Sequence, residues 1–228
     1  MKFPIEIAAV AFDLDGTLVE TLPDLNESAL RMLKHIGRPA VSEATVRACV
    51  GDGVDRLVKR LLTGKPDGEP DAEAFEKAVE SFRSHYASVL TRASHPFAGV
   101  VSTLEILRER GFKLACVTNK PARFTEPLLE RLGLTAYLDV VISGDSLARK
   151  KPDPLPLVHT ARAFGIEPAQ LLTVGDSPVD TQAARAAGCP VFCVPYGYRG
   201  VLTVQELDCD AIVPTLPDLL YLIRIPHS

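Results

Sequence analysis

The chain alternates between short apolar runs and longer segments with helical spacing. Residues 5–12 (IEIAAVAF) are almost all apolar and end at an acidic, glycine-containing stretch, which is typical of a buried strand that leads into a polar loop. Glycine follows several of the helical segments, as expected at a helix C-terminus. The alternation predicts right-handed βαβ units and a parallel sheet covered by helices on both faces. Further short strands are expected at 113–118, 139–143, 171–175, 191–194 and 211–213.

Residues 17–92 follow a different pattern, because no strand-like run separates their helical segments. Amphipathic helices are expected there around Leu25, Val46, Leu57 and Phe82. A turn-rich stretch, TGKPDGEPD at 63–71, separates two of them. We therefore expect a helical cap domain at 17–92, inserted into a catalytic core made of 1–16 and 93–228. The predicted fold class is α/β, with a three-layer core around a mostly parallel, Rossmann-like sheet plus this inserted α-helical cap.

Composition excludes several classes of protein. Of the 228 residues, 46% are hydrophobic and 24% are charged, which is typical of an ordinary globular protein with a sizeable core. A net charge of −4 provides no basic surface, so no nucleic acid is expected as a partner. The N-terminal apolar run is too short to span a membrane, and the five scattered cysteines favour free thiols in a reducing, cytoplasmic compartment. The sequence leaves open whether the chain forms a homo-oligomer.

The strongest chemical signal is DLDGT, which contains Asp13 and Asp15 directly after the first predicted strand. Ligands of open α/β sheets bind beyond the carboxyl ends of the strands, where this loop is expected. Two carboxylates so close together repel each other, which indicates a bound cation. Asp and Gly also form ordinary turns, but the whole motif after a strand favours function.

Two later segments offer groups that bind phosphate. Thr118 and Asn119 end a predicted strand, where a hydroxyl and a backbone N–H can donate to phosphate oxygens, although both residue types also cap helices. Lys151 is the last of three cations before a proline in RKKPDP. It is expected to provide a fixed positive charge, the alternative being a solvated basic loop.

A second acidic motif, GDSPVD, follows the strand predicted at 171–175. Asp176 would complete a site of hard oxygen ligands for Mg²⁺. Asp180 lies in the first turn of the next helix, where it either orients the metal ligands or simply caps the helix.

The motifs DLDGT, TN, KKP and GDSPVD, in this order, resemble those of the haloacid dehalogenase superfamily. The helical insert falls where the first cap type of that superfamily falls. Within the superfamily, the chain resembles the phosphoglycolate phosphatases through GDGVDRLVKRLL, SGDSLARKKPDPLPL, VGDSPVDTQAARAAGC and PYGYRG.

The resemblance implies a role for each acidic residue. Asp13 would be the nucleophile that forms an aspartyl-phosphate intermediate, and Asp15 would act first as an acid and then as a base. The cofactor Mg²⁺ would bind a carboxylate oxygen of Asp13, the backbone carbonyl of Asp15 and a carboxylate oxygen of Asp176. Asp180 would orient these ligands from behind.

The remaining residues would hold the phosphoryl oxygens, namely through the Thr118 hydroxyl, the Asn119 backbone N–H and the Lys151 ammonium. The implied activity is Mg²⁺-dependent hydrolysis of a small phosphorylated metabolite, 2-phosphoglycolate, to glycolate and phosphate. Three alternatives stay open: a phosphatase for another small ester such as a sugar phosphate or pyrophosphate, a phosphomutase, and a non-catalytic binding protein. A binding protein is expected to have lost a charged site residue, and here all of them are present.

Overall fold

A computed structural model describes residues 2–200 and 202–226. Its helices are α1 (Leu22–His35), α2 (Glu43–Cys49), α3 (Val54–Thr63), α4 (Ala72–Val89), α5 (Val100–Glu109), α6 (Ala122–Arg131), α7 (Leu155–Phe164) and α8 (Pro178–Ala187). Its strands are β1 (Ile5–Glu6), β2 (Ala9–Phe12), β3 (Val19–Glu20), β4 (His95–Pro96), β5 (Lys113–Val117), β6 (Val140–Ile142), β7 (Leu171–Gly175), β8 (Val191–Cys193), β9 (Ala211–Ile212) and β10 (Ile223–Arg224). Short 3₁₀ helices occur at Thr135–Tyr137, Pro168–Gln170, Val204–Glu206 and Leu216–Tyr221.

The central sheet has six strands in the order β6-β5-β2-β7-β8-β9, and all neighbours run parallel. Strand β2 lies between β5 and β7, with Phe12 paired to Cys116 on one side and to Val174 on the other. The loops that leave the carboxyl ends of these three strands therefore meet at one edge of the sheet.

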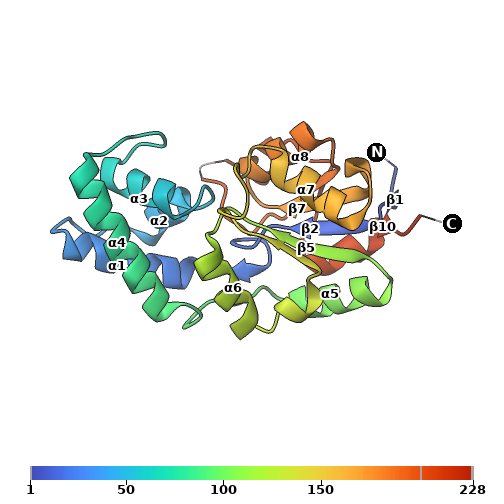
Figure 1. Cartoon of the computed structure of the whole chain (residues 1–228), viewed down its shortest axis with the longest axis horizontal. Coiled ribbons are helices and arrows are strands. Elements are labelled where there is room, and N and C mark those ends of the chain that lie inside the picture. The colour runs from blue at the N-terminus through green and yellow to red at the C-terminus, as the bar shows by residue number, and fades with distance from the viewer. Residues whose placement is uncertain (1, 201, 227–228) are drawn as a thin grey trace.

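Helices cover both faces of this sheet, which gives three layers (Figure 1). The two faces differ in side-chain size. On β2, Ala9 and Ala11 face the layer of α7 and α8, whereas the bulkier Val10 and Phe12 belong to the cluster on the opposite face. This alternation is the period of two that a strand imposes on its side chains. The predicted three-layer α/β class is confirmed.

The first apolar run does not form one continuous strand as its pattern predicts. It divides into β1 and β2, because Ile7 donates its backbone N–H to Arg224 O and Ala8 donates to Gln170 O. Strand β1 pairs instead with β10 from the C-terminal end of the chain, in a separate two-stranded sheet. The sequence pattern shows that these residues are buried but not which partner they pair with.

Helices α1–α4 pack together as a cap at one end of the molecule (Figure 1). The cap joins the core through a two-stranded antiparallel ladder of β3 and β4, which the apolar pattern does not indicate. Asp24 of α1, 1% exposed, accepts hydrogen bonds from the backbone N–H groups of Ala93 (3.0 Å) and Ser94 (2.8 Å). These bonds fasten the start of α1 to the returning chain. The predicted cap boundaries at residues 17 and 92 stay predictions.

Within residues 2–200 and 202–226, the structure has no helix that combines the length and apolar character needed to cross a bilayer.

Candidate functional site

The residues predicted to act in catalysis, metal binding or phosphate binding lie at one edge of the central sheet. Asp13 directly follows β2, Thr118 directly follows β5 and Asp176 directly follows β7. Because these three strands are parallel neighbours, the polar side chains that follow them gather in one place. Lys151 and Asp180 reach the same place from the loop before α7 and from the first turn of α8.

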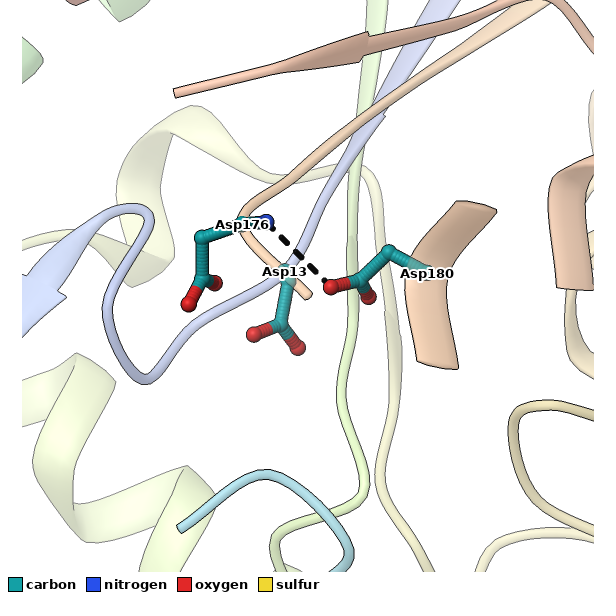
Figure 2. Close-up of side chains that lie close together, drawn as sticks. All are labelled: Asp13, Asp176 and Asp180. Atoms are coloured by element: carbon teal, nitrogen blue, oxygen red, sulfur yellow. Dashed lines mark hydrogen bonds between the residues drawn. The ribbon is translucent and has the colours of Figure 1, made fainter. Parts of the chain in front are cut away.

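Three carboxylates form the centre of the site. Asp13, Asp176 and Asp180 each provide an oxygen, and these oxygens all lie within 4.8 Å of one another. Figure 2 shows the three side chains approaching from separate segments of the chain. Asp176 and Asp180 are each 1% exposed, so this negative charge is held away from bulk water.

The position of Asp176 is fixed on all sides. Its Oδ1 accepts a hydrogen bond from the Thr17 hydroxyl (2.8 Å), and its Oδ2 accepts from the backbone N–H of Tyr198. Two glycines make room for it, since a Cβ on Gly16 would lie 2.8 Å from Oδ2 and one on Gly197 would lie 2.3 Å from the Asp176 side chain. Gly16 also has a φ of +90°, which side chains rarely tolerate. The sequence therefore specifies a carboxylate with little freedom to move.

Burial and mutual repulsion perturb these acids strongly. Burial raises the pKa of Asp13 from 3.8 to about 7; Lys151 lowers it, while Asp180 and Asp15 raise it further. Burial, followed by Asp180 and Asp13, also raises the pKa of Asp176 well above its ordinary value. The cluster thus holds more negative charge than its protein surroundings neutralise. Buried carboxylate oxygens in this number are the ligands that a hard divalent cation prefers, so the donor set fits Mg²⁺.

Lys151 is the cation that pairs with this cluster. Its Nζ lies 2.8 Å from Asp13 Oδ1 and 2.6 Å from Asp180 Oδ1, and the residue is 3% exposed. Burial acts against its charged form, but the two carboxylates outweigh burial and raise its pKa above the ordinary lysine value. The ammonium is therefore permanently charged and fixed beside Asp13.

Asp180 caps its helix, one of the two alternatives that its sequence position suggests, and it also pairs with Lys151; its role in orienting the metal ligands stays a prediction. Its Oδ1 accepts the bond from Lys151, while its Oδ2 accepts from the backbone N–H of Ser177 (3.1 Å) and from the Ser177 hydroxyl (2.6 Å). It thus caps α8 and orients the lysine at the same time.

Thr118 and Asn119 lie in the same cavity as Asp13. The Thr118 hydroxyl oxygen accepts a hydrogen bond from the backbone N–H of Lys120 (3.2 Å), which leaves its own proton available to a ligand. The Asn119 side-chain amide donates to Lys151 O (2.9 Å) and to Gly51 O (3.3 Å), so it connects the lysine loop with the cap. Their roles in phosphate binding stay predictions.

Lys120 is a site residue that the motif analysis does not single out. Its Nζ lies 2.9 and 3.2 Å from the two carboxylate oxygens of Asp15, and 4.7 Å from the ring centroid of Tyr86 in α4. Burial acts against its charge, but Asp15 and Tyr86 raise its pKa above the ordinary value. The only local signal for it is a lysine immediately after Asn119 at a strand end. Its partners lie far away in the sequence, so the pattern alone could not identify it.

The cap closes the site. The cavity between cap and core, lined by Asp13 and Asp15 from below, has a volume of about 30 Å³, which accommodates about one water molecule. Lys150 fastens the closed arrangement from the core side by donating to Asp52 O in the cap loop (2.6 Å). A substrate must therefore enter while the cap is open.

The geometry agrees with what the chain resembles among known proteins. The haloacid dehalogenase-like hydrolase family model matches residues 10–194. A phosphoglycolate phosphatase of Thiobacillus denitrificans is 51% identical over 97% of this chain and 98% of its own length, and one of Nitrosospira multiformis is 50% identical over 98% and 99%. A crystal structure described as a predicted phosphoglycolate phosphatase from Haemophilus somnus superposes with a TM-score of 0.89 at 35% identity, over 95% of this chain and 97% of that one. With this sequence similarity across nearly its whole length and the same fold, the chain belongs to the haloacid dehalogenase-like hydrolase family.

Proposed function

We propose that the chain is a Mg²⁺-dependent phosphatase that hydrolyses 2-phosphoglycolate to glycolate and phosphate. One observation carries the proposal: Asp13 and Asp15 line a single cavity under the cap, and Asp13 is held there by a buried lysine at 2.8 Å. The names of the relatives support the choice of substrate.

In the first half of the reaction, an Asp13 carboxylate oxygen attacks the phosphorus and displaces the alkoxide of the ester. The bond between phosphorus and the leaving oxygen breaks, and Asp15 donates a proton to that oxygen. Lys151, the Thr118 hydroxyl and the backbone N–H of Asn119 stabilise the charge on the other phosphoryl oxygens.

In the second half, a water molecule attacks the aspartyl-phosphate on Asp13. Asp15 has lost its proton in the first step, so it now accepts one from this water. The products are inorganic phosphate and a regenerated carboxylate. The position of the cap over Asp13 and Asp15 supports this sequence, because a covered site limits the access of bulk water during the transfer.

We place Mg²⁺ at Asp13, Asp176 and the backbone carbonyl of Asp15. When bound, the ion neutralises the phosphoryl oxygens and the excess negative charge of the carboxylates. The raised pKa values of Asp13 and Asp176 support this assignment, since they mark a cluster that lacks a cation. The five free cysteines support a reducing, cytoplasmic location.

The proposal is tested by measuring phosphate release from 2-phosphoglycolate with Mg²⁺ and with EDTA. Asp13→Asn keeps the side-chain volume but removes the nucleophile, so kcat should fall at least about a thousandfold. Asp67→Asn, at an exposed loop position, is the matched control and should match the wild type. A sugar phosphate and pyrophosphate complete the substrate panel. Wild-type turnover by Asp13→Asn, or faster release from one of these other esters, contradicts the proposal.

A further inference from the structure

The wall of the cavity differs between its two sides. The cap contributes only aliphatic side chains and glycines, with Leu25, Val50, Val54 and Leu57 closing over the site. The core contributes Asp13, Asp15 and the polar residues after β5. No cap side chain with a hydroxyl, amide or charged group lines the cavity in the described part of the chain, so a leaving group rich in hydroxyls would find few side-chain hydrogen-bond partners there.

Charge is also distributed unevenly in this cavity. Among its lining residues as described, Lys120 is the single cation; the other buried lysine of the site, Lys151, pairs with Asp13 and Asp180 and is assigned to the phosphoryl oxygens. Lys120 is 4% exposed and its ammonium is fixed against both oxygens of Asp15. With the polar groups of Thr118 and Asn119 assigned to the phosphoryl oxygens, a carboxylate on the leaving group would find its cation at that ammonium, since two carboxylates and an aliphatic cap wall line most of the remaining cavity.

The position of Lys120 relative to the reaction follows from Asp15. A leaving oxygen that receives a proton from Asp15 must lie within hydrogen-bond distance of that carboxylate. Lys120 already contacts the same carboxylate at 2.9 Å, so it lies next to the leaving group. An ammonium has three N–H donors, which allows Lys120 to hold Asp15 and a second anion together.

We infer that Lys120 binds the carboxylate of the leaving group and so makes the site selective for compact, carboxylate-bearing phosphate esters. The inference rests on the proposed function and deepens it by naming the residue that recognises the carboxylate of the substrate. Tyr86 supports the ammonium from the cap side, with its ring centroid 4.7 Å from Nζ. The cap therefore contributes one wall of the receptor around this ammonium.

The test compares esters that differ in one group. Ethyl phosphate has a methyl where 2-phosphoglycolate has its carboxylate, and O-phosphoethanolamine places an ammonium at the end of a chain of similar length. The measured quantity is the ratio of kcat/KM for 2-phosphoglycolate to kcat/KM for ethyl phosphate. Lys120→Gln keeps a donor for Asp15 but removes the charge, so this ratio should fall by tenfold or more, about what a charged hydrogen bond contributes.

Taking a ratio separates recognition from other effects of the substitution. Damage to Asp15, to metal binding or to the fold slows both esters together and leaves the ratio unchanged. Lys150→Met is the matched control, because it removes a nearby core lysine that contacts the cap backbone at Asp52. It is expected to slow both reactions through weaker closure and to leave the ratio unchanged. Lys120→Arg keeps the charge and should retain most of the preference.

Two results would overturn the inference while leaving the proposed function intact. One is a Lys120→Gln enzyme that hydrolyses 2-phosphoglycolate with the wild-type ratio. The other needs no variant. If the wild-type enzyme hydrolyses O-phosphoethanolamine or pyrophosphate with the same kcat/KM as 2-phosphoglycolate, the site does not select a carboxylate. If the wild type released no phosphate from any of these esters with Mg²⁺ present, the proposed function itself would fail.

Discussion

Removing the charge of Asp13 should stabilise the metal-free protein while destroying its activity. The pKa of Asp13 rises from 3.8 to about 7 in the folded chain, chiefly through burial. Between these two values the folded state keeps a proton that the unfolded state has released, so stability falls as pH rises through this window. At about 1.4 kcal/mol per pH unit, the raised pKa of Asp13 lowers the free energy of unfolding, relative to its value at acid pH, by roughly 2 kcal/mol at pH 5 and roughly 4 kcal/mol at pH 8.

Asparagine does not titrate, so Asp13→Asn lacks this slope. In EDTA, its stability advantage over the wild type should grow by about 3 kcal/mol between pH 5 and pH 8. For a chain of this length, that change corresponds to about 6 to 12 °C in Tm. Urea denaturation and thermal melts of both proteins at the two pH values measure it. Groups distant from the cluster titrate equally in both proteins and cancel in the difference, whereas Asp176, whose pKa the charge of Asp13 raises, adds to it.

Mg²⁺ supplies the second half of this experiment. Saturating Mg²⁺ neutralises the cluster in the wild type, so the pH-dependent difference between the two proteins should shrink. Asp67→Asn again serves as control, since an exposed carboxylate should show neither effect. The reasoning is refuted if the wild type and Asp13→Asn show the same dependence of stability on pH in EDTA.

Two further substitutions probe the frame around the cluster. Lys151→Met leaves Asp13 and Asp180 buried without their shared cation. Urea denaturation should therefore show that the free energy of unfolding falls by about 3 to 5 kcal/mol, and phosphate release should nearly cease. An unchanged free energy of unfolding would contradict the buried pairing. Gly197→Ala places a Cβ 2.3 Å from the Asp176 side chain. The apparent affinity for Mg²⁺ should therefore fall about 10- to 100-fold, while the far-UV circular dichroism spectrum stays native. A wild-type affinity for Mg²⁺ would show that Asp176 is not held as described.

The architecture of the core was predictable from sequence because its signals are local. Strands β5 and β7 are short apolar runs that end in polar or glycine residues, and their predicted positions differ from the observed ones by at most one residue. The break between β1 and β2 was not predictable, because it depends on β10 at the other end of the chain. A residue's tendency to form a strand is encoded nearby, whereas its pairing partner is not.

The same distinction applies to the site. Asp13 and Asp176 are marked by motifs at strand ends, so the sequence indicates them directly. The burial of Lys120 depends on Asp15 and on Tyr86 from the cap, and these contacts exist only after folding. For Asp180, the sequence offers a helix cap or a role in orienting the metal ligands; the structure shows the cap through one oxygen and a bond to Lys151 through the other, and the orienting role stays a prediction.

The ladder of β3 and β4 has a consequence for how proteins of this kind diversify. The two chain segments that connect the cap to the core contain β3 and β4 and lie side by side. The hydrogen bonds of Asp24 join the same two segments. The helices beyond that junction can change in length or composition without displacing the strand ends that bear the acids. Selection can therefore remodel the cap wall around the leaving group while the phosphorus chemistry of the core is inherited intact.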